Sequence, residues 1–328
     1  MPAFLRLIRV PNLLFIAFIQ LVMQKSVIEP IMQVFGLDTG MDPFLLGLLI
    51  VGSVAIAAGG YALNDYFDVK IDLINRPGAT IVGKSISRRN AMLLQQVFTA
   101  IGVLCGLVLA YSIHSFTVAF IFIVVPGLLW FYSASYKRQF LIGNLVVSFN
   151  AALAVLVVGI TQLALLEKEF GRFIYETPVP KNFYSWIGGF AVFAFFCTWI
   201  RETVKDMEDE NGDREMECRT MPIVWGIKKS KLFVYALILV TIAGLVTTNA
   251  FFIQFPGSLT TRYMIFGLIL PLLALGYLVF YAKNPSDFHQ ASSFSKIIML
   301  LGVLYSFLFY YEQAKLHGIS LFGLFWVK

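Results

Sequence analysis

Long apolar runs separated by short polar segments occupy most of this 328-residue chain. A helix that crosses a bilayer needs ~20 mostly apolar residues. Nine runs have a suitable length, at residues 13–35, 44–64, 91–112, 116–133, 141–163, 184–203, 232–253, 262–282 and 294–313. The pattern therefore predicts an all-α, polytopic membrane protein with nine transmembrane helices. We expect residues 1–328 to form one domain.

The composition is typical of a membrane protein rather than a soluble one. Hydrophobic residues make up 59% of the chain and charged residues 13%, whereas soluble domains contain ~25% charged residues. The mean hydropathy is +0.79. We therefore expect a lipid bilayer around the protein, and no nucleic acid among its partners.

The polar segments between the apolar runs alternate in charge. Those near Arg9 and at residues 70–89, 137–138 and 201–231 contain most of the 25 lysines and arginines. Because basic residues accumulate on the cytoplasmic side of membrane proteins, this side is predicted to face the cytoplasm. Nine spans then place the N-terminus inside and the C-terminus outside the cell (inner or plasma) membrane.

Two sets of three aspartates follow the second and the sixth apolar run, both on the predicted cytoplasmic side. Within each set the carboxylates stand at positions i, i+3 and i+7, which share one face if the helix continues. The first aspartate set is Asp65, Asp68 and Asp72, and the second is Asp206, Asp209 and Asp213. The segments that carry them, about residues 65–90 and 204–231, are predicted to cap the bundle.

This concentration of negative charge at helix ends is costly unless the carboxylates are solvated, paired or bound to a cation. Mg²⁺ removes the repulsion because it prefers oxygen ligands. It is usually held by one or two carboxylates together with waters and the phosphates of a substrate. The two aspartate sets therefore predict Mg²⁺ as a cofactor and a ligand that bears phosphate.

Basic side chains that could contact phosphate oxygens lie close to both aspartate sets. They are Arg76, Lys84, Arg88 and Arg89 after the first set, Arg214 and Arg219 after the second, and Lys137 before the fifth run. Because the site opens into an apolar bundle, a diphosphate joined to a hydrocarbon chain fits both halves. An isoprenyl diphosphate is therefore the expected donor. Aromatic faces can stabilise its allylic carbocation away from water, and the candidates are Tyr61, Tyr66, Phe67, Tyr132 and Tyr136.

The two motifs resemble those of the UbiA superfamily of intramembrane prenyltransferases, and the resemblance covers nearly the whole chain. The family pattern NDxxDxxxD appears as Asn64-Asp65-Tyr66-Phe67-Asp68-Val69-Lys70-Ile71-Asp72. The second pattern, DxxDxxxD, appears at residues 206–213. The resemblance implies a bundle of nine helices around a central cavity with cytoplasmic cap loops, and a Mg²⁺-dependent prenyl transfer.

The resemblance also implies roles for individual residues. Metal binding is implied for Asn64, Asp65, Asp68, Asp72, Asp206, Asp209 and Asp213. Catalytic roles are implied for Asp68, Asp72, Asp206 and Asp209. Substrate contacts are expected from Arg9, Asn12, Asn64, Arg76, Lys84, Tyr132, Lys137, Asn144, Lys205 and Arg214.

Within the superfamily, residues 74–77, 132–133, 137 and 143–144 are most similar to the geranylgeranylglyceryl phosphate geranylgeranyltransferase branch. This similarity implies geranylgeranylglyceryl phosphate as the acceptor. The stretch from Ala79 to Lys84 departs from the Arg-Pro-Ile-Pro-Ser-Gly sequence that is usual in the branch. An aromatic acceptor, as in quinone biosynthesis, therefore stays open as an alternative.

A cation transporter is the alternative from a different functional class, because intramembrane acids can bind ions. The acids of this chain gather at one membrane face, however. Apart from Lys25 and Glu29, no charged residue recurs through the spans to form a path across the bilayer. Paired helix breaks at the midplane, which are common in transporters, are not evident either, so we favour the enzyme.

Overall fold

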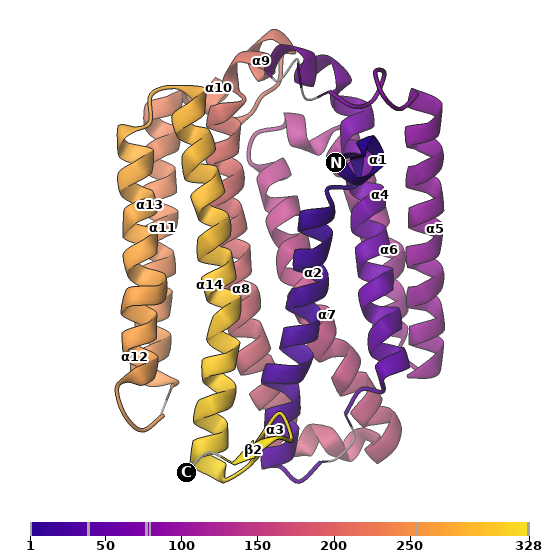
Figure 1. Cartoon of the computed structure of the whole chain (residues 1–328), viewed down its shortest axis with the longest axis vertical. Helices are drawn as coiled ribbons and strands as arrows, with labels where there is room; N and C mark the ends of the chain where they lie inside the picture. The colour runs from indigo at the N-terminus through magenta and orange to yellow at the C-terminus, as the bar shows by residue number, and fades with distance from the viewer. Residues whose placement is uncertain (1, 38–39, 76–77, 79, 254, 327–328) are drawn as a thin grey trace.

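The computed structural model describes residues 2–37, 40–75, 78, 80–253 and 255–326. Its long helices run side by side along the longest axis of the molecule (Figure 1). The N-terminus lies toward the end that carries α9 (Glu210–Glu215) and α10 (Met221–Trp225), and the C-terminus lies at the opposite end. This placement agrees with an odd number of spans.

Within the described residues, nine helical segments are long and apolar enough to cross a membrane. This agrees with the nine spans predicted from the sequence. The first comprises α2 (Val10–Met23), η1 (Gln24–Ile28) and α3 (Glu29–Val34), after the short α1 (Ala3–Leu7). The next five are α4 (Pro43–Asn75), α5 (Arg88–Ser112), α6 (Phe116–Ala134), α7 with η3 (Ile142–Phe170 and Gly171–Glu176) and α8 (Pro178–Glu208). The last three are α11 (Ile227–Phe251), α12–η4–α13 (Leu259–Tyr263, Met264–Ile269 and Leu270–Tyr281) and α14 (Pro285–His317).

The remaining elements are short. A 3₁₀ turn, η2 (Tyr136–Arg138), joins α6 to α7. The chain ends in a small antiparallel hairpin of β1 (Ser320–Leu321) and β2 (Phe325–Trp326). The π-helical turns η1 and η4 each precede a proline, Pro30 and Pro271. Because proline lacks an N–H and crowds the preceding turn, widened turns at these positions are expected.

The helices α4 and α8 extend beyond the apolar runs from which they were predicted. α4 continues through the whole first aspartate set to Asn75. Residues 65–75, which were predicted to begin a cap segment, are therefore helical, and the predicted start at residue 65 was too early. α8 likewise continues to Glu208, and the residues that follow form α9 and α10 rather than one loop from 204 to 231. α4 presents the whole first set on helical backbone, as its spacing requires. The second set is divided, because Asp206 lies on α8, Asp209 at the break after α8 and Asp213 on α9. The helix therefore does not continue through the second set, and its three aspartates do not share one helix face.

Two apolar clusters hold the bundle together. The first joins residues of α2 to α8 with α14, and the second joins α8, α11, α13 and α14. α8 and α14 contribute residues to both clusters, so these two helices connect the two parts of the apolar core. The N-terminal half of α8 packs in the first cluster, and its C-terminal half, which carries Asp206, packs in the second.

Small residues allow α5 to approach its neighbours closely. A Cβ atom added at Gly102 would lie 2.5 Å from the side chain of Ile56 on α4, and one at Gly106 would lie 2.1 Å from the ring of Phe122 on α6. Small residues at helix contacts are a common basis of membrane helix packing. This packing fixes α4, which carries the first aspartate set.

The segment after α4 is anchored to the bundle rather than projecting into solvent. Ile81 and Val82 are buried against Leu7 of α1 and Ala62 of α4. A bridge between Val82 and Ile86 closes the turn that follows. Ile81 and Val82 therefore attach this part of the chain to α1 and α4.

Candidate functional site

Asp65 forms an ion pair with Arg9, which precedes α2. Arg9 Nη2 lies 2.8 Å from Asp65 Oδ1, and the guanidinium group also lies over the Tyr61 ring, 5.1 Å from its centroid. Arg9 has a left-handed backbone conformation with φ of 52°. A non-glycine residue in this region is uncommon, and here it turns the chain between α1 and α2. The first predicted substrate residue therefore lies beside the first aspartate set.

Lys137 contacts two residues of the first motif. Its Nζ forms an ion pair with Asp68 and donates to Asn64 Oδ1 at 3.3 Å. Lys137 comes from η2, which folds back over the start of α7: a Cβ at Gly143 would lie 2.7 Å from the Lys137 Cα. Burial lowers the pKa of Lys137, although the nearby Asp68 carboxylate opposes this effect. The structure therefore places a buried lysine directly against the aspartates.

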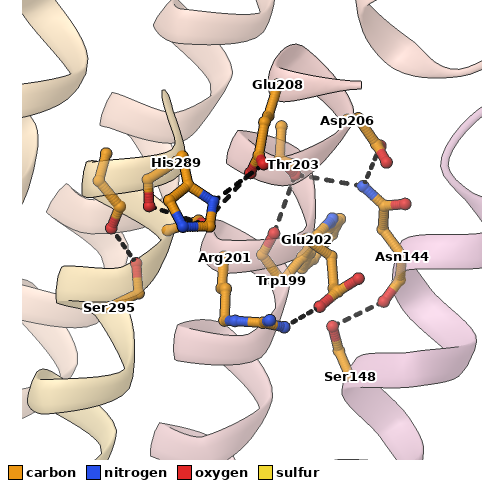
Figure 2. A network of polar contacts seen from close by, with 12 residues as sticks. Asn144, Ser148, Trp199, Arg201, Glu202, Thr203, Asp206, Glu208, His289 and Ser295 are labelled. Atoms are coloured by element: carbon orange, nitrogen blue, oxygen red, sulfur yellow. Dashed lines mark hydrogen bonds and ion pairs between the residues drawn. The ribbon is translucent and has the colours of Figure 1, made fainter. Parts of the chain in front are cut away.

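Asp206, the first residue of the second aspartate set, is bound by Asn144 of α7. The Asn144 Nδ2 donates to Asp206 Oδ2 at 2.8 Å and lies 3.4 Å from Thr203 Oγ1 (Figure 2). Asn144 is buried. Tyr132, on α6, lies close enough to Asp206, Glu202 and Asp68 for their charges to act on its hydroxyl. The structure thus brings members of both aspartate sets together with five predicted substrate residues, Arg9, Asn64, Tyr132, Lys137 and Asn144.

Asp213, at the end of the second set, is 8% exposed. It accepts a hydrogen bond from the Thr220 hydroxyl at 3.0 Å. Burial raises the pKa of Asp213 to about 6, although the Thr220 hydrogen bond opposes the shift. This carboxylate lies outside the spanning segments and is protonated more readily than an exposed aspartate.

One asparagine joins the two motifs directly. Asn75, the last residue of α4, donates through Nδ2 to the Asp209 carbonyl at 3.2 Å. Its Oδ1 accepts the Gly212 backbone N–H at 2.9 Å. A Cβ at position 212 would lie 2.5 Å from Asn75 Nδ2, so the contact needs glycine. We call this contact the Asn75–Gly212 junction.

Replacing Gly212 with alanine is expected to open the Asn75–Gly212 junction. Overpacking of this kind costs about 1–3 kcal/mol of stability, and it separates the two aspartate sets. We expect a lower melting temperature in detergent and a lower turnover. Gly244→Ala is the matched control, because nothing lies within 4 Å of its added Cβ. If the Gly212 variant behaved like the control, the junction would have no structural role.

Other predicted residues lie farther from the centre of the site or outside the described part of the chain. Arg76 is outside the described residues. Lys84 is exposed in the turn between Val82 and Ile86. Arg214 is largely exposed and pairs with Glu210 at 2.6 Å on its own short helix. Asn12 is half-buried one turn after Arg9, whose carbonyl accepts its backbone N–H.

The side-chain oxygens at the site are of the kind that binds Mg²⁺, although they do not form a complete coordination sphere. Carboxylate and amide oxygens are the hard ligands that Mg²⁺ prefers. Among the described residues, no three acidic, histidine or cysteine side chains converge as a metal site. The acids are held instead by Arg9, Lys137, Asn144 and Thr220. Such an arrangement suits an ion whose remaining ligands are waters and phosphate oxygens.

A model of the UbiA prenyltransferase family matches residues 34–313 of this chain. A digeranylgeranylglyceryl phosphate synthase from Sulfurisphaera tokodaii is 31% identical over 229 residues. That alignment covers 68% of this chain and 74% of the relative.

Two solved structures have the same fold. A digeranylgeranylglyceryl phosphate synthase in membranes superposes with a TM-score of 0.61 at 21% identity, over 93% of this chain and 98% of that chain. A UbiA homolog from Archaeoglobus fulgidus bound to GPP and Mg²⁺ gives a TM-score of 0.55 at 14% identity, over 93% of this chain and 99% of that chain.

Proposed function

The chain belongs to the UbiA prenyltransferase family, and we propose that it transfers a prenyl group from an isoprenyl diphosphate to geranylgeranylglyceryl phosphate. The observation that carries this proposal is the meeting of both aspartate sets, through the Asn75–Gly212 junction, beside the buried Lys137. The name of the Sulfurisphaera tokodaii relative supports the choice of acceptor.

We propose Mg²⁺ as the cofactor, as in the Archaeoglobus fulgidus homolog. In the first motif it would be held by Asn64, Asp68 and Asp72, with Asp65 anchored to Arg9 beside them. In the second motif it would be held by Asp206, Asp209 and Asp213. When bound, Mg²⁺ withdraws charge from the leaving diphosphate.

The protein's own residues have three tasks in this reaction. Lys137 adds positive charge where the diphosphate leaves, and such preorganised charge is a large part of catalysis. As the bond between the prenyl carbon and the diphosphate oxygen breaks, its electron pair leaves with the diphosphate. The aromatic face of Tyr132 then stabilises the allylic cation, whereas the Tyr61 ring already carries the Arg9 guanidinium group. The acceptor hydroxyl forms the new carbon–oxygen bond and releases its proton to water.

A product screen tests the acceptor. Purified protein receives geranylgeranyl diphosphate and Mg²⁺ with geranylgeranylglyceryl phosphate, 4-hydroxybenzoate or dihydroxynaphthoate in parallel, and products are identified by mass spectrometry. We expect diphosphate release and a prenylated product with the glycerol phosphate only. Turnover of the aromatic compounds alone would refute this acceptor, and no diphosphate release with any of them would refute the enzyme.

The same assay in sealed vesicles reports the orientation of the site. We propose that the aspartate sets and the N-terminus face the cytoplasm and the C-terminus the outside, because basic residues dominate the aspartate side. The donor diphosphate is charged and does not cross a bilayer unaided. Activity should therefore appear in inside-out vesicles, whereas activity confined to right-side-out vesicles would reverse the topology.

A further inference from the structure

A second concentration of charge lies beside the aspartate sets, around the buried carboxylate of Glu202. Glu202 is 8% exposed and forms an ion pair with Arg201, its neighbour on α8 (Figure 2). Lys205, Arg9 and Lys296 also lie close enough for their charges to act on Glu202. One buried carboxylate is thus surrounded by four cations, which we call the Glu202 cluster.

The members of the Glu202 cluster come from three parts of the chain. Arg201 and Lys205 stand one turn apart on α8, Lys296 comes from α14, and Arg9 precedes α2. α14 is fixed against α8 here, because Ile200 and Val204 pack in one apolar cluster with Ala291 and Ile298. The relative positions of the cations therefore depend on two rigid, packed helices.

The positive charge in the Glu202 cluster is not neutralised within the protein. Arg9 is already bound to Asp65, and Arg201 to Glu202. Within the described part of the chain, the side chains of Lys205 and Lys296 form no ion pair or hydrogen bond. The Nε atom of Arg201 is buried and also lacks an acceptor among these residues. A buried donor without an acceptor is costly, and the two lysines beside it are charged donors, so the group suits an incoming oxyanion.

We propose that the Glu202 cluster binds the phosphate of the acceptor, an inference that rests on the proposed function. Arg201, Lys205 and Lys296 would supply the charge-assisted hydrogen bonds that a phosphate group takes from several donors. Lys205 also lies within electrostatic range of Asp72 and Asp213. It therefore links the acceptor's phosphate to the metal site, where the donor diphosphate binds.

The position of the Glu202 cluster favours the acceptor's phosphate, rather than the donor's diphosphate, as its ligand. The donor's diphosphate belongs with the aspartates and with Lys137, which reaches Asp68 from the junction of α6 and α7. Lys296 belongs to α14, and its side chain is exposed. Lys137 beside Asp68 and Lys296 on α14 thus give one cation to each of two phosphate-bearing substrates, and Arg9 and Lys205 lie between them, since both also act on Asp65. The phosphate of the acceptor, with its greater charge, would then be preferred over the single carboxylate of an aromatic acceptor.

Lys296→Gln tests this assignment, with Lys229→Gln as the matched control. Lys229 is an exposed lysine at the start of α11 on the same side of the membrane. We expect Lys296→Gln to raise the KM for geranylgeranylglyceryl phosphate about 10-fold, the size of one charged hydrogen bond. The KM for the prenyl diphosphate should stay within about twofold, and the control should change neither value.

A second variant guards against misfolding. Arg201→Lys keeps a cation beside Glu202 but removes the buried Nε donor, so we expect a smaller rise in the acceptor's KM. Glycerol 1-phosphate should also compete with the acceptor in the wild type and compete less well in Lys296→Gln. All variants are compared in neutral detergent and in vesicles with anionic lipid, with melting temperatures measured alongside.

Each other result overturns the inference in a distinguishable way. An increase in the donor's KM alone would assign the cluster to the diphosphate. A defect that appears only in anionic vesicles would assign it to lipid headgroups. Unchanged kinetics in both variants would leave the cluster without a substrate. If the wild-type protein did not use geranylgeranylglyceryl phosphate, the proposed function itself would be wrong. The Glu202 cluster would then lose the ligand assigned to it.

Discussion

Asp68→Asn and Asp206→Asn are each expected to lower prenyl transfer by about 10³-fold, the upper end of the loss from removing one preorganised electrostatic group. Asparagine keeps the size of the side chain but removes the charge that attracts a divalent cation. Asp206 is also an acceptor for the Asn144 amide, and an asparagine can still offer that amide an oxygen. Each variant should therefore fold, and diphosphate release under saturating Mg²⁺ measures the loss.

Glu215→Gln is the matched control for both substitutions. Glu215 is exposed, and it lies two residues after Asp213 on the same face of the membrane. It should keep wild-type activity, and all three variants should keep the wild-type melting temperature within a few degrees. Full activity of either aspartate variant would remove that residue from the site.

Lys137→Gln is expected to lower turnover by about 10²-fold, because one positive charge no longer faces the leaving diphosphate. Lys137 also pairs with Asp68, so it competes with a metal ion for that carboxylate. Its removal should therefore lower the Mg²⁺ concentration that gives half-maximal activity, even as turnover falls. Titrating the residual activity with Mg²⁺ separates these two effects.

Lys137→Arg and Lys228→Gln complete this comparison. Arginine keeps the charge without the lysine's compact shape, so it should recover part of the lost turnover. Lys228 is exposed on α11, and its replacement should have no effect. A Lys137→Gln variant with normal turnover and an unchanged Mg²⁺ requirement would show that Lys137 only neutralises Asp68.

The nine spans could be predicted because each is long and apolar, but the ends of the helices could not. Hydropathy reports contact with lipid, and it falls at Asn64, where the first motif begins. α4 nevertheless continues to Asn75, and Ile71 is buried on it. Its polar end is stabilised by packing and by partners from distant segments rather than by lipid. Composition therefore identified the membrane part of this helix but missed the part that forms the site.

The spacing of the aspartates correctly predicted helical presentation of the first set. The flanking charges pointed to Lys137, which the structure places against Asp68, while its role in binding substrate stays a prediction. The partners of each carboxylate depended on tertiary structure, and family resemblance supplied Arg9 and Asn144. Asn75 was missed because it acts through the backbone of Asp209 and Gly212, which leaves no pattern of charge. Lys296 was missed because a lysine near the end of an apolar run is what the positive-inside rule predicts in any membrane protein, so its position gave no separate signal.

The pairing of the aspartates has a consequence for the biosynthesis of this protein. Arg9 is translated 56 residues before Asp65, and Lys137 follows Asp68 by only 69 residues. Asn144 likewise precedes Asp206 by 62 residues. Arg9 and Asp65 can thus meet once the second span is made, and Lys137 becomes available to Asp68 after the fourth. The Asn144–Asp206 contact needs the sixth span, and the Asn75–Gly212 contact, across 137 residues, forms only after it.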